Sequence, residues 1–188
     1  MPDYIQVFTR GKFWPLEPHR GAIDLHDIAH SLSLLCRYAG HIDRFYSVAQ
    51  HSIMVSLLVP AKDALWGLMH DASEAYLLDI PAPLKKMDAL RPYREAEAKL
   101  MRAIALTFHM ESEQPESIHE ADLKARRVEA EELMSPPVDN WTSNLPEYSA
   151  NDRILFKRIA NMGMYQAEKA FLARYEEITG CKTPSEWR

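Results

Sequence analysis

The sequence predicts an all-α protein, a bundle of five to six helices with a small β-hairpin at its N-terminus. The main observation is helical periodicity, since apolar residues recur at a spacing of three and four over long stretches of the chain. A second observation is local, because residues 4–9 alternate apolar and polar side chains and are followed by Arg10-Gly11. That pattern predicts a hairpin that turns at Gly11 and packs on the helices, since two strands alone are rarely stable.

Turn and capping residues divide the helical part. Asp24 caps a predicted helix that Gly40 ends, and Ser47 caps the next one, which Pro60 separates from a third. A polar, Pro-rich loop precedes the last helix, and Gly180 stops that helix. The predicted helices are residues 25–39, 47–59, 61–78, 92–110, 115–134 and 151–179, with the loop at residues 135–149.

Composition limits the class of protein and its partners. The chain has 188 residues, 47% of them hydrophobic, which predicts a single domain over residues 1–188 with a real core. A net charge of −5 disfavours nucleic acid as a partner, but a small anionic substrate needs only a local positive pocket. No apolar run approaches the roughly 18 residues that cross a bilayer, and two distant cysteines indicate no disulfide framework. We therefore expect a cytoplasmic protein without a membrane partner.

The chain is organised around residues 65–83, LWGLMHDASEAYLLDIPAP. An otherwise apolar predicted helix carries His70, Asp71 and Glu74, and Asp79 follows just past its end. Glu74 lies four residues after His70, so the two side chains are predicted to share a helix face. Burying three carboxylates and an imidazole is costly, and a bound metal ion would compensate for that cost.

Two further predicted helices supply matching donors. His51 lies on the preceding apolar helix, and Asp122 lies within EADLKARR further along the chain. Together with His70 and Asp71 they form a set of two histidines and two carboxylates. Such a set suits a divalent metal with open positions for water and a phosphate oxygen. Zn, Co, Mn, Fe and Mg stay open, because the donor set does not choose among them.

Three segments resemble the HD-domain metal-dependent phosphohydrolases: QHS at 50–52, HDASEAYLLDIPAPLK at 70–85 and EAD at 120–122. Within that group the sequence is most similar to the 5'-deoxynucleotidase branch and its phage relatives, which hydrolyse deoxynucleoside triphosphates. The resemblance runs from about residue 24 to residue 127. It is specific, because HDxxExxxxDxPxP fixes several polar positions, whereas a bare His-Asp pair would be weak evidence.

The resemblance implies roles for residues that the pattern alone leaves open. Asp122 matches the family's last metal ligand. Arg37, followed by the aromatic Tyr38, matches a phosphate- or sugar-binding arginine beside a base-contacting aromatic, although the family usually has Trp there. Lys85 matches a lysine near phosphate. From the residues alone, Arg37 is a cation favoured by a helix C-terminus and Lys85 a solvated lysine.

The expected function is metal-dependent hydrolysis of a deoxynucleotide. Glu74 would orient or deprotonate the attacking water, and Asp79 would protonate the leaving oxygen or bind a second ion. We favour a deoxynucleoside triphosphate triphosphohydrolase that prefers dATP, with a 5'-deoxynucleotidase acting on monophosphates as the alternative. A cyclic-nucleotide phosphodiesterase and a non-catalytic metal- or nucleotide-binding module are two further classes. The resemblance also implies a homo-oligomer.

Overall fold

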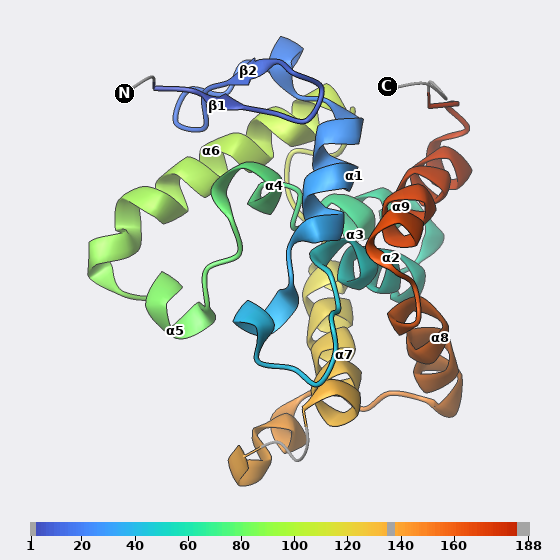
Figure 1. Ribbon diagram of the computed structural model, residues 1–188. Helices are drawn as coiled ribbons and strands as arrows, with labels where there is room; N and C mark the ends of the chain where they lie inside the picture. Colours follow the sequence, from blue (N-terminus) through green and yellow to red (C-terminus); the bar gives the residue numbers. More distant parts are fainter. Residues whose placement is uncertain (1–2, 135–137, 184–188) are drawn as a thin grey trace.

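The computed structural model describes residues 3–134 and 138–183, and it is all-α with a small N-terminal hairpin, as the sequence predicts (Figure 1). The described ranges hold nine α-helices instead of five to six, because two of the predicted helices are each divided in two and one short helix was not predicted. The helices are α1 Leu25–Leu34, α2 Val48–Leu58, α3 Ala64–Met69, α4 Glu74–Leu77, α5 Ala82–Lys85, α6 Arg91–Thr107, α7 Glu116–Leu133, α8 Ala150–Ala160 and α9 Met164–Thr179.

The predicted hairpin is present as β1 (Ile5–Gln6) and β2 (Lys12–Phe13), paired antiparallel. Phe13 is fully buried and stacks on Tyr76, with ring centroids 3.9 Å apart. The backbone N–H of Thr9 donates to the Asp27 carboxylate of α1 at 2.7 Å. The Thr9 hydroxyl also donates to Asp27, at 3.0 Å, and Phe8 stacks on His30 of α1. The hairpin is therefore fixed to the helices by aromatic contacts and by hydrogen bonds to a carboxylate, as its small size requires.

The first predicted helix is shorter than expected. Asp24 caps it as predicted, accepting from the His26 backbone N–H at 2.7 Å, but α1 ends at Leu34. The chain then becomes extended, and Cys36 forms an antiparallel bridge with Ser47. The short 3₁₀ segment η2 (Arg37–Gly40) follows. The prediction of helix to residue 39 was wrong because backbone pairing with the segment before α2 replaces the helical hydrogen bonds.

Helix α2 forms the centre of the core and lies against α3, α7, α8 and α9 (Figure 1). Ser47 begins it with a capping box, as its predicted N-cap role requires. The neighbouring α3 approaches α2 at Gly67, where a Cβ atom would lie only 2.8 Å from the Ser56 Cα. Glycine thus permits the close packing that brings the end of α3 next to α2.

The predicted helix over residues 61–78 is interrupted where its polar residues lie. A short 3₁₀ segment, η3 (Ala61–Asp63), precedes α3, and residues 70–73 form turns between α3 and α4. The N–H of Glu74 bonds to the carbonyl of Asp71 at 3.0 Å, a bond of the tighter i→i+3 type. The argument that His70 and Glu74 share one helix face was therefore wrong, because no continuous helix joins them.

The last predicted helix is also two helices. Ser149 caps α8, and residues 161–163 separate α8 from α9, which begins after Gly163. Gly180 ends α9 in the left-handed conformation, as predicted, with φ of 71°. Within the predicted loop, residues 138–144 form the 3₁₀ segment η5, while residues 135–137 lie outside the described residues. No described helix combines the length and apolar character that crossing a membrane needs.

Candidate functional site

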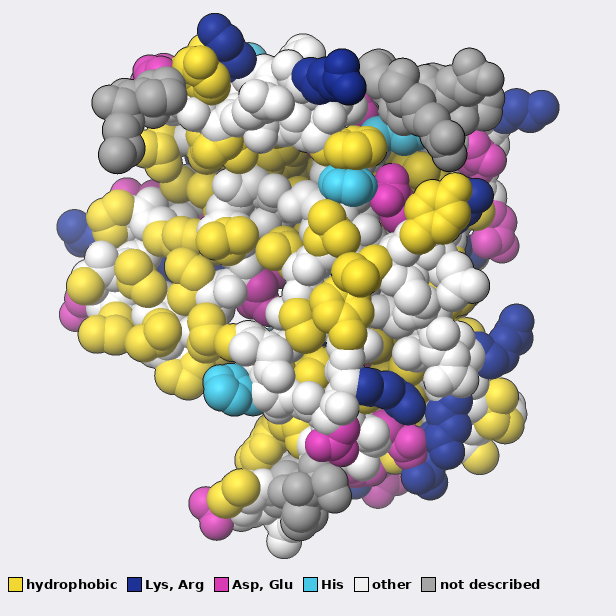
Figure 2. Space-filling view, in the orientation of Figure 1, with side chains coloured by type: hydrophobic (Ala, Val, Ile, Leu, Met, Phe, Trp, Pro, Cys, Tyr) yellow, Lys and Arg dark blue, Asp and Glu magenta, His cyan; other side chains and the backbone are white. Residues whose placement is uncertain are grey.

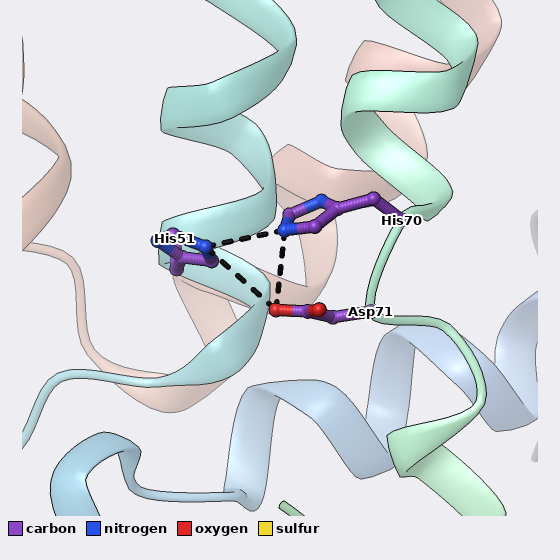
Figure 3. A group of neighbouring side chains, drawn as sticks. All are labelled: His51, His70 and Asp71. Carbon is purple, nitrogen blue, oxygen red and sulfur yellow. Dashed lines mark hydrogen bonds and ion pairs between the residues drawn. The ribbon is translucent and has the colours of Figure 1, made fainter. Parts of the chain in front are cut away.

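His51, His70 and Asp71 form a compact group of potential metal ligands (Figure 3). His51 comes from α2, while His70 and Asp71 follow the end of α3. His70 Nε2 lies 3.2 Å from His51 Nε2 and 3.2 Å from Asp71 Oδ2, and His51 Nε2 lies 3.7 Å from Asp71 Oδ2. The turn after α3 lets two successive residues face the same point, which a regular helix would prevent.

The hydrogen bonds behind the histidines fix which ring nitrogen faces the group. The Nδ1–H of His70 donates to the Gly67 carbonyl at 2.8 Å. The Nδ1–H of His51 donates to the Glu129 carboxylate at 2.6 Å. Both rings therefore direct Nε2, with its lone pair, toward Asp71. Histidines that bind metals are commonly oriented by such a bond from the other ring nitrogen.

This arrangement of three side chains is more favourable with a bound cation than without one. Two Nε2 lone pairs at 3.2 Å and a carboxylate oxygen are all acceptors, so they repel unless a proton or a metal ion lies among them. Imidazole and carboxylate donors together suit Zn and other divalent first-row metals. The residues present therefore fit a divalent ion, as the sequence predicts, whereas the metal's identity stays a prediction.

Asp122 of α7 reaches the same group through His51. Its Oδ1 lies 3.1 Å from His51 Nε2. Burial and Arg37 lower the pKa of His51, but the Glu129 and Asp122 carboxylates outweigh them and raise it to about 9. Burial raises the pKa of Asp122, but the hydrogen bond with His51 outweighs it and lowers the pKa to about 2. A group that attracts a proton onto its histidine so strongly will also attract a metal cation.

Glu129 is the residue that sequence reasoning missed. It is fully buried on α7 and accepts hydrogen bonds from His51, from Arg37 Nε at 3.2 Å and from the Tyr38 hydroxyl at 2.8 Å. Burial raises its pKa, but Arg37 and His51 outweigh burial, so the net pKa is below the usual range. Its spacing is the available signal, because Glu129 follows Asp122 by seven residues and so lies on the same helix face.

A cavity of about 630 Å³ opens above the metal-ligand group, within the size range of small-molecule sites. It lies between the segment around α5 and the 3₁₀ segment η5. Figure 2 shows a hollow between these two segments. Every predicted site residue except the two metal-site histidines lines it. The predicted residues in its wall are Arg37, Tyr38, Asp71, Glu74, Asp79, Lys85 and Asp122.

Glu74 and Asp79, the predicted catalytic carboxylates, both face this cavity. Glu74 is only 6% exposed, and its Oε2 has no hydrogen-bond partner within residues 3–134 and 138–183. Burial, Asp71 and Asp79 all raise the pKa of Glu74 well above its ordinary value. Leu78 precedes Asp79 with φ of 70° and ψ of 157°, a backbone region that residues other than glycine rarely adopt.

The three predicted substrate contacts line the cavity, but each already has a partner. Arg37 is buried between Glu129 and Asp71, with Nη1 3.6 Å from Asp71 Oδ2. Tyr38 donates its hydroxyl to Glu129. Lys85 Nζ lies 2.5 Å from Glu97 Oε1 of α6. Arg37 and Tyr38 therefore also hold the buried Glu129 in place, a role that the sequence did not indicate.

Two more wall residues were not among the predicted site residues. Arg126 lies on α7, one turn after Asp122, and Trp141 lies on η5 across the cavity. The sequence offered little signal for either, because a charged residue on an amphipathic helix is usually solvated and Trp141 falls in a loop-like stretch. The wall thus contains an arginine and an aromatic beyond those the family resemblance indicates.

Comparisons with known proteins give a family but no activity. No model of a known protein family matches the chain. Over 131 residues it is 40% identical to the uncharacterized protein YfdR of Escherichia coli, a match covering 70% of this chain and 72% of YfdR. It is 34% identical to the uncharacterized protein RCAP_rcc00048 of Rhodobacter capsulatus, covering 63% of this chain and 66% of that protein. The chain belongs to the protein family that includes YfdR.

Proposed function

We propose that the protein is a metal-dependent phosphohydrolase of the HD-domain type, acting on deoxynucleotides. The observation that carries the proposal is the convergence of His51 Nε2, His70 Nε2 and Asp71 Oδ2 beside a cavity with a buried carboxyl group, Glu74. A metal site that served structure alone would not need an unpartnered buried carboxyl group next to it. The likeness of residues 70–85 to the HD-domain pattern supports the same reading.

A divalent ion held by His51, His70, Asp71 and Asp122 would polarise a phosphate and lower the pKa of a water molecule bound to it. The residues behind the site act before any reaction. Glu129 holds His51 with Nε2 directed inward, and Gly67 does the same for His70. The two imidazoles are thus pre-positioned and need little rearrangement when a ligand binds.

Glu74 is the proposed general base. Its raised pKa favours the protonated form when no cation is present, and a positive charge next to it would favour the carboxylate. Its Oε2 can then accept a proton from the attacking water. Asp79, which also lines the cavity, would give its own proton to the leaving 5' oxygen when it is protonated, and would end as the carboxylate. Binding a second ion is the other role that Asp79 can fill.

The proposed substrate class rests on the charges and the aromatic residue of the cavity wall and on the family resemblance. The cavity wall carries four carboxylates, and two of its three cationic side chains are already paired with carboxylates. A phosphate next to the carboxylates would therefore be repelled unless a divalent cation is present. Trp141 provides an aromatic surface on which a base can stack. We place the substrate among deoxynucleoside triphosphates, with dATP preferred and triphosphate as the product, because the sequence most resembles the phage branch.

A panel of nucleotides tests this proposal. The purified protein is incubated with Co²⁺, Mn²⁺ or Zn²⁺ and with dNTPs, dNMPs and ribonucleotides, and the products are separated by chromatography. Release of tripolyphosphate from dATP supports the triphosphohydrolase, whereas inorganic phosphate from dNMPs moves the assignment to a 5'-deoxynucleotidase. Equal rates on ATP and dATP would contradict the deoxyribose preference. If no nucleotide is hydrolysed with any metal, the enzyme proposal fails.

A further inference from the structure

Among the cations that line the cavity, Arg126 differs from the others in having no acidic partner. Arg37 is held by Glu129 and Asp71, and Lys85 is held by Glu97. Arg126 is half-buried and forms no ion pair or hydrogen bond with any residue in the two described ranges, 3–134 and 138–183. A guanidinium in the cavity wall whose donors are uncommitted is available for an anionic ligand.

Arg127, the next residue of α7, does form hydrogen bonds, so its side chain is not available in the same way. Arg127 Nε donates to Glu131 at 3.1 Å, and its Nη1 donates to the Leu145 carbonyl at 2.8 Å. Arg127 therefore connects α7 to the end of the segment that carries η5. The two successive arginines thus differ: Arg127 stabilises the cavity wall through its hydrogen bonds, whereas Arg126 faces the cavity.

Position on the helix relates Arg126 to the metal-ligand group. Arg126 follows Asp122 by four residues, so the two side chains lie on one face of α7 with Cβ atoms about 5–6 Å apart. Arg37, by contrast, contacts Asp71 directly. A phosphate next to the metal ligands would therefore meet Arg37 first, and a phosphate one step further along a chain would meet Arg126.

Resting on the proposed function, we propose that Arg126 binds a distal phosphate of a nucleoside di- or triphosphate whose first phosphate lies at the metal site. The planar guanidinium matches phosphate oxygens with two parallel hydrogen bonds, and both bonds are charge-assisted. The position of Arg126 would thereby select for phosphate chain length, which the sequence motifs leave open.

Binding measurements test this assignment without relying on turnover. Isothermal titration calorimetry is carried out with Mn²⁺-loaded protein in a Glu74→Gln background, using dATP, dAMP and deoxyadenosine as ligands. Adding Arg126→Gln should weaken dATP binding about 10- to 100-fold, the range for a lost hydrogen bond to a charged group, with little change for dAMP. Arg126→Lys should lose less, because it keeps the charge without the planar donors.

Lys124→Gln is the matched control, since Lys124 lies on the same helix with the same charge but outside the cavity wall. It should bind dATP like the Glu74→Gln parent. Equal dATP binding by the parent and the Arg126→Gln variant would overturn the assignment while leaving the proposed function intact. An equal loss for dAMP and dATP would overturn the distal position. If the Mn²⁺-loaded parent binds neither dATP nor dAMP, both the assignment and the proposed function fail.

Discussion

The floor and the rim of the cavity are built in opposite ways. The floor consists of the candidate metal ligands His51, His70, Asp71 and Asp122. Short hydrogen bonds and ion pairs tie them to one another, to the backbone or to the buried Glu129 behind them. The rim consists of residues 37–41, residues 78–83 and η5. It is more exposed, and its backbone departs from ordinary conformations, with positive φ at Tyr38, Ala39 and Leu78.

This difference indicates a division of roles between the floor and the rim of the cavity. Fixing the floor before any ligand binds costs desolvation, but it leaves the acceptors in a geometry that a divalent ion can use at once. The unusual rim conformations cost about 1–3 kcal/mol each and persist only where the surroundings enforce them. We infer that the floor carries the chemistry and that the rim sets which nucleotide binds. Each of the following substitutions tests one side of that division.

The largest expected effect is on turnover, at Glu74. Glu74→Gln should keep the bound metal but lower kcat about 10²- to 10⁴-fold, because it removes the proposed proton acceptor and leaves the ligand set intact. Metal content from elemental analysis, measured beside the rate, checks this. If metal is lost in step with the rate, Glu74 is a ligand and belongs to the floor.

Next is the support behind the floor, at Glu129. Glu129→Gln should lower the free energy of unfolding by about 3–5 kcal/mol, because it leaves the buried Arg37 short of a charge partner. Metal affinity should fall about 10- to 100-fold through loss of the His51 orientation. Urea denaturation and metal titration measure the two effects.

Glu132→Gln provides the control for that substitution. Glu132 is on the same helix, but its partners Arg153 and Lys157 are about half exposed. Although the Glu132 side chain is only 11% exposed, its replacement should cost about 1 kcal/mol, because both partners stay solvated. If Glu129→Gln and Glu132→Gln change stability and metal affinity by similar amounts, the floor is not held by Glu129.

At the rim, Trp141 should affect binding more than chemistry. Trp141→Ala should raise the KM for dATP by about 10-fold, since stacking of a base on an aromatic contributes about 1–3 kcal/mol, and kcat should change little. Trp14→Ala, on the N-terminal side outside the cavity wall, should leave KM unchanged. A fall in kcat at constant KM for Trp141→Ala would contradict the assignment of base binding to the rim.

The smallest effect concerns rim strain, at Leu78. Leu78→Gly should leave stability unchanged or raise it by up to about 2 kcal/mol, because relief of strain exceeds the entropy cost of glycine. Leu84→Gly is the matched control, since Leu84 is also exposed but lies in α5 with helical geometry, and it should lose about 0.5–1 kcal/mol. Equal losses measured by urea denaturation would show that Leu78 is not strained.

The sequence could predict those features whose signals are local or periodic. His51, His70 and Asp71 were predicted because polar residues on apolar helices stand out from their surroundings, whereas Asp122, on a charged helix, was predicted from the family resemblance. Caps such as Asp24, Ser47 and Gly180 were also predicted, because their signals are local. The all-α class followed from periodicity, which tertiary contacts rarely reverse.

What escaped prediction depends on contacts between distant segments. The turns at residues 70–73 interrupt a stretch with good helical periodicity, and α3 can end there because Gly67 packs closely on α2. Glu129 looks like any other charge on an amphipathic helix until α7 is placed beside α2. The pairing of Lys85 with Glu97 likewise requires knowing how α5 packs on α6.

The central claim is that the floor binds a divalent metal on which activity depends, and metal content of the Asp71→Ala variant tests it most directly. Elemental analysis of the wild-type protein dialysed against Mn²⁺, Co²⁺ or Zn²⁺ should find about one equivalent per chain at this ligand set. Asp71→Ala should lose that metal and nearly all nucleotide hydrolysis while its circular dichroism spectrum stays helical. An Asp71→Ala protein that retains the metal and hydrolyses nucleotides at the wild-type rate would contradict the account.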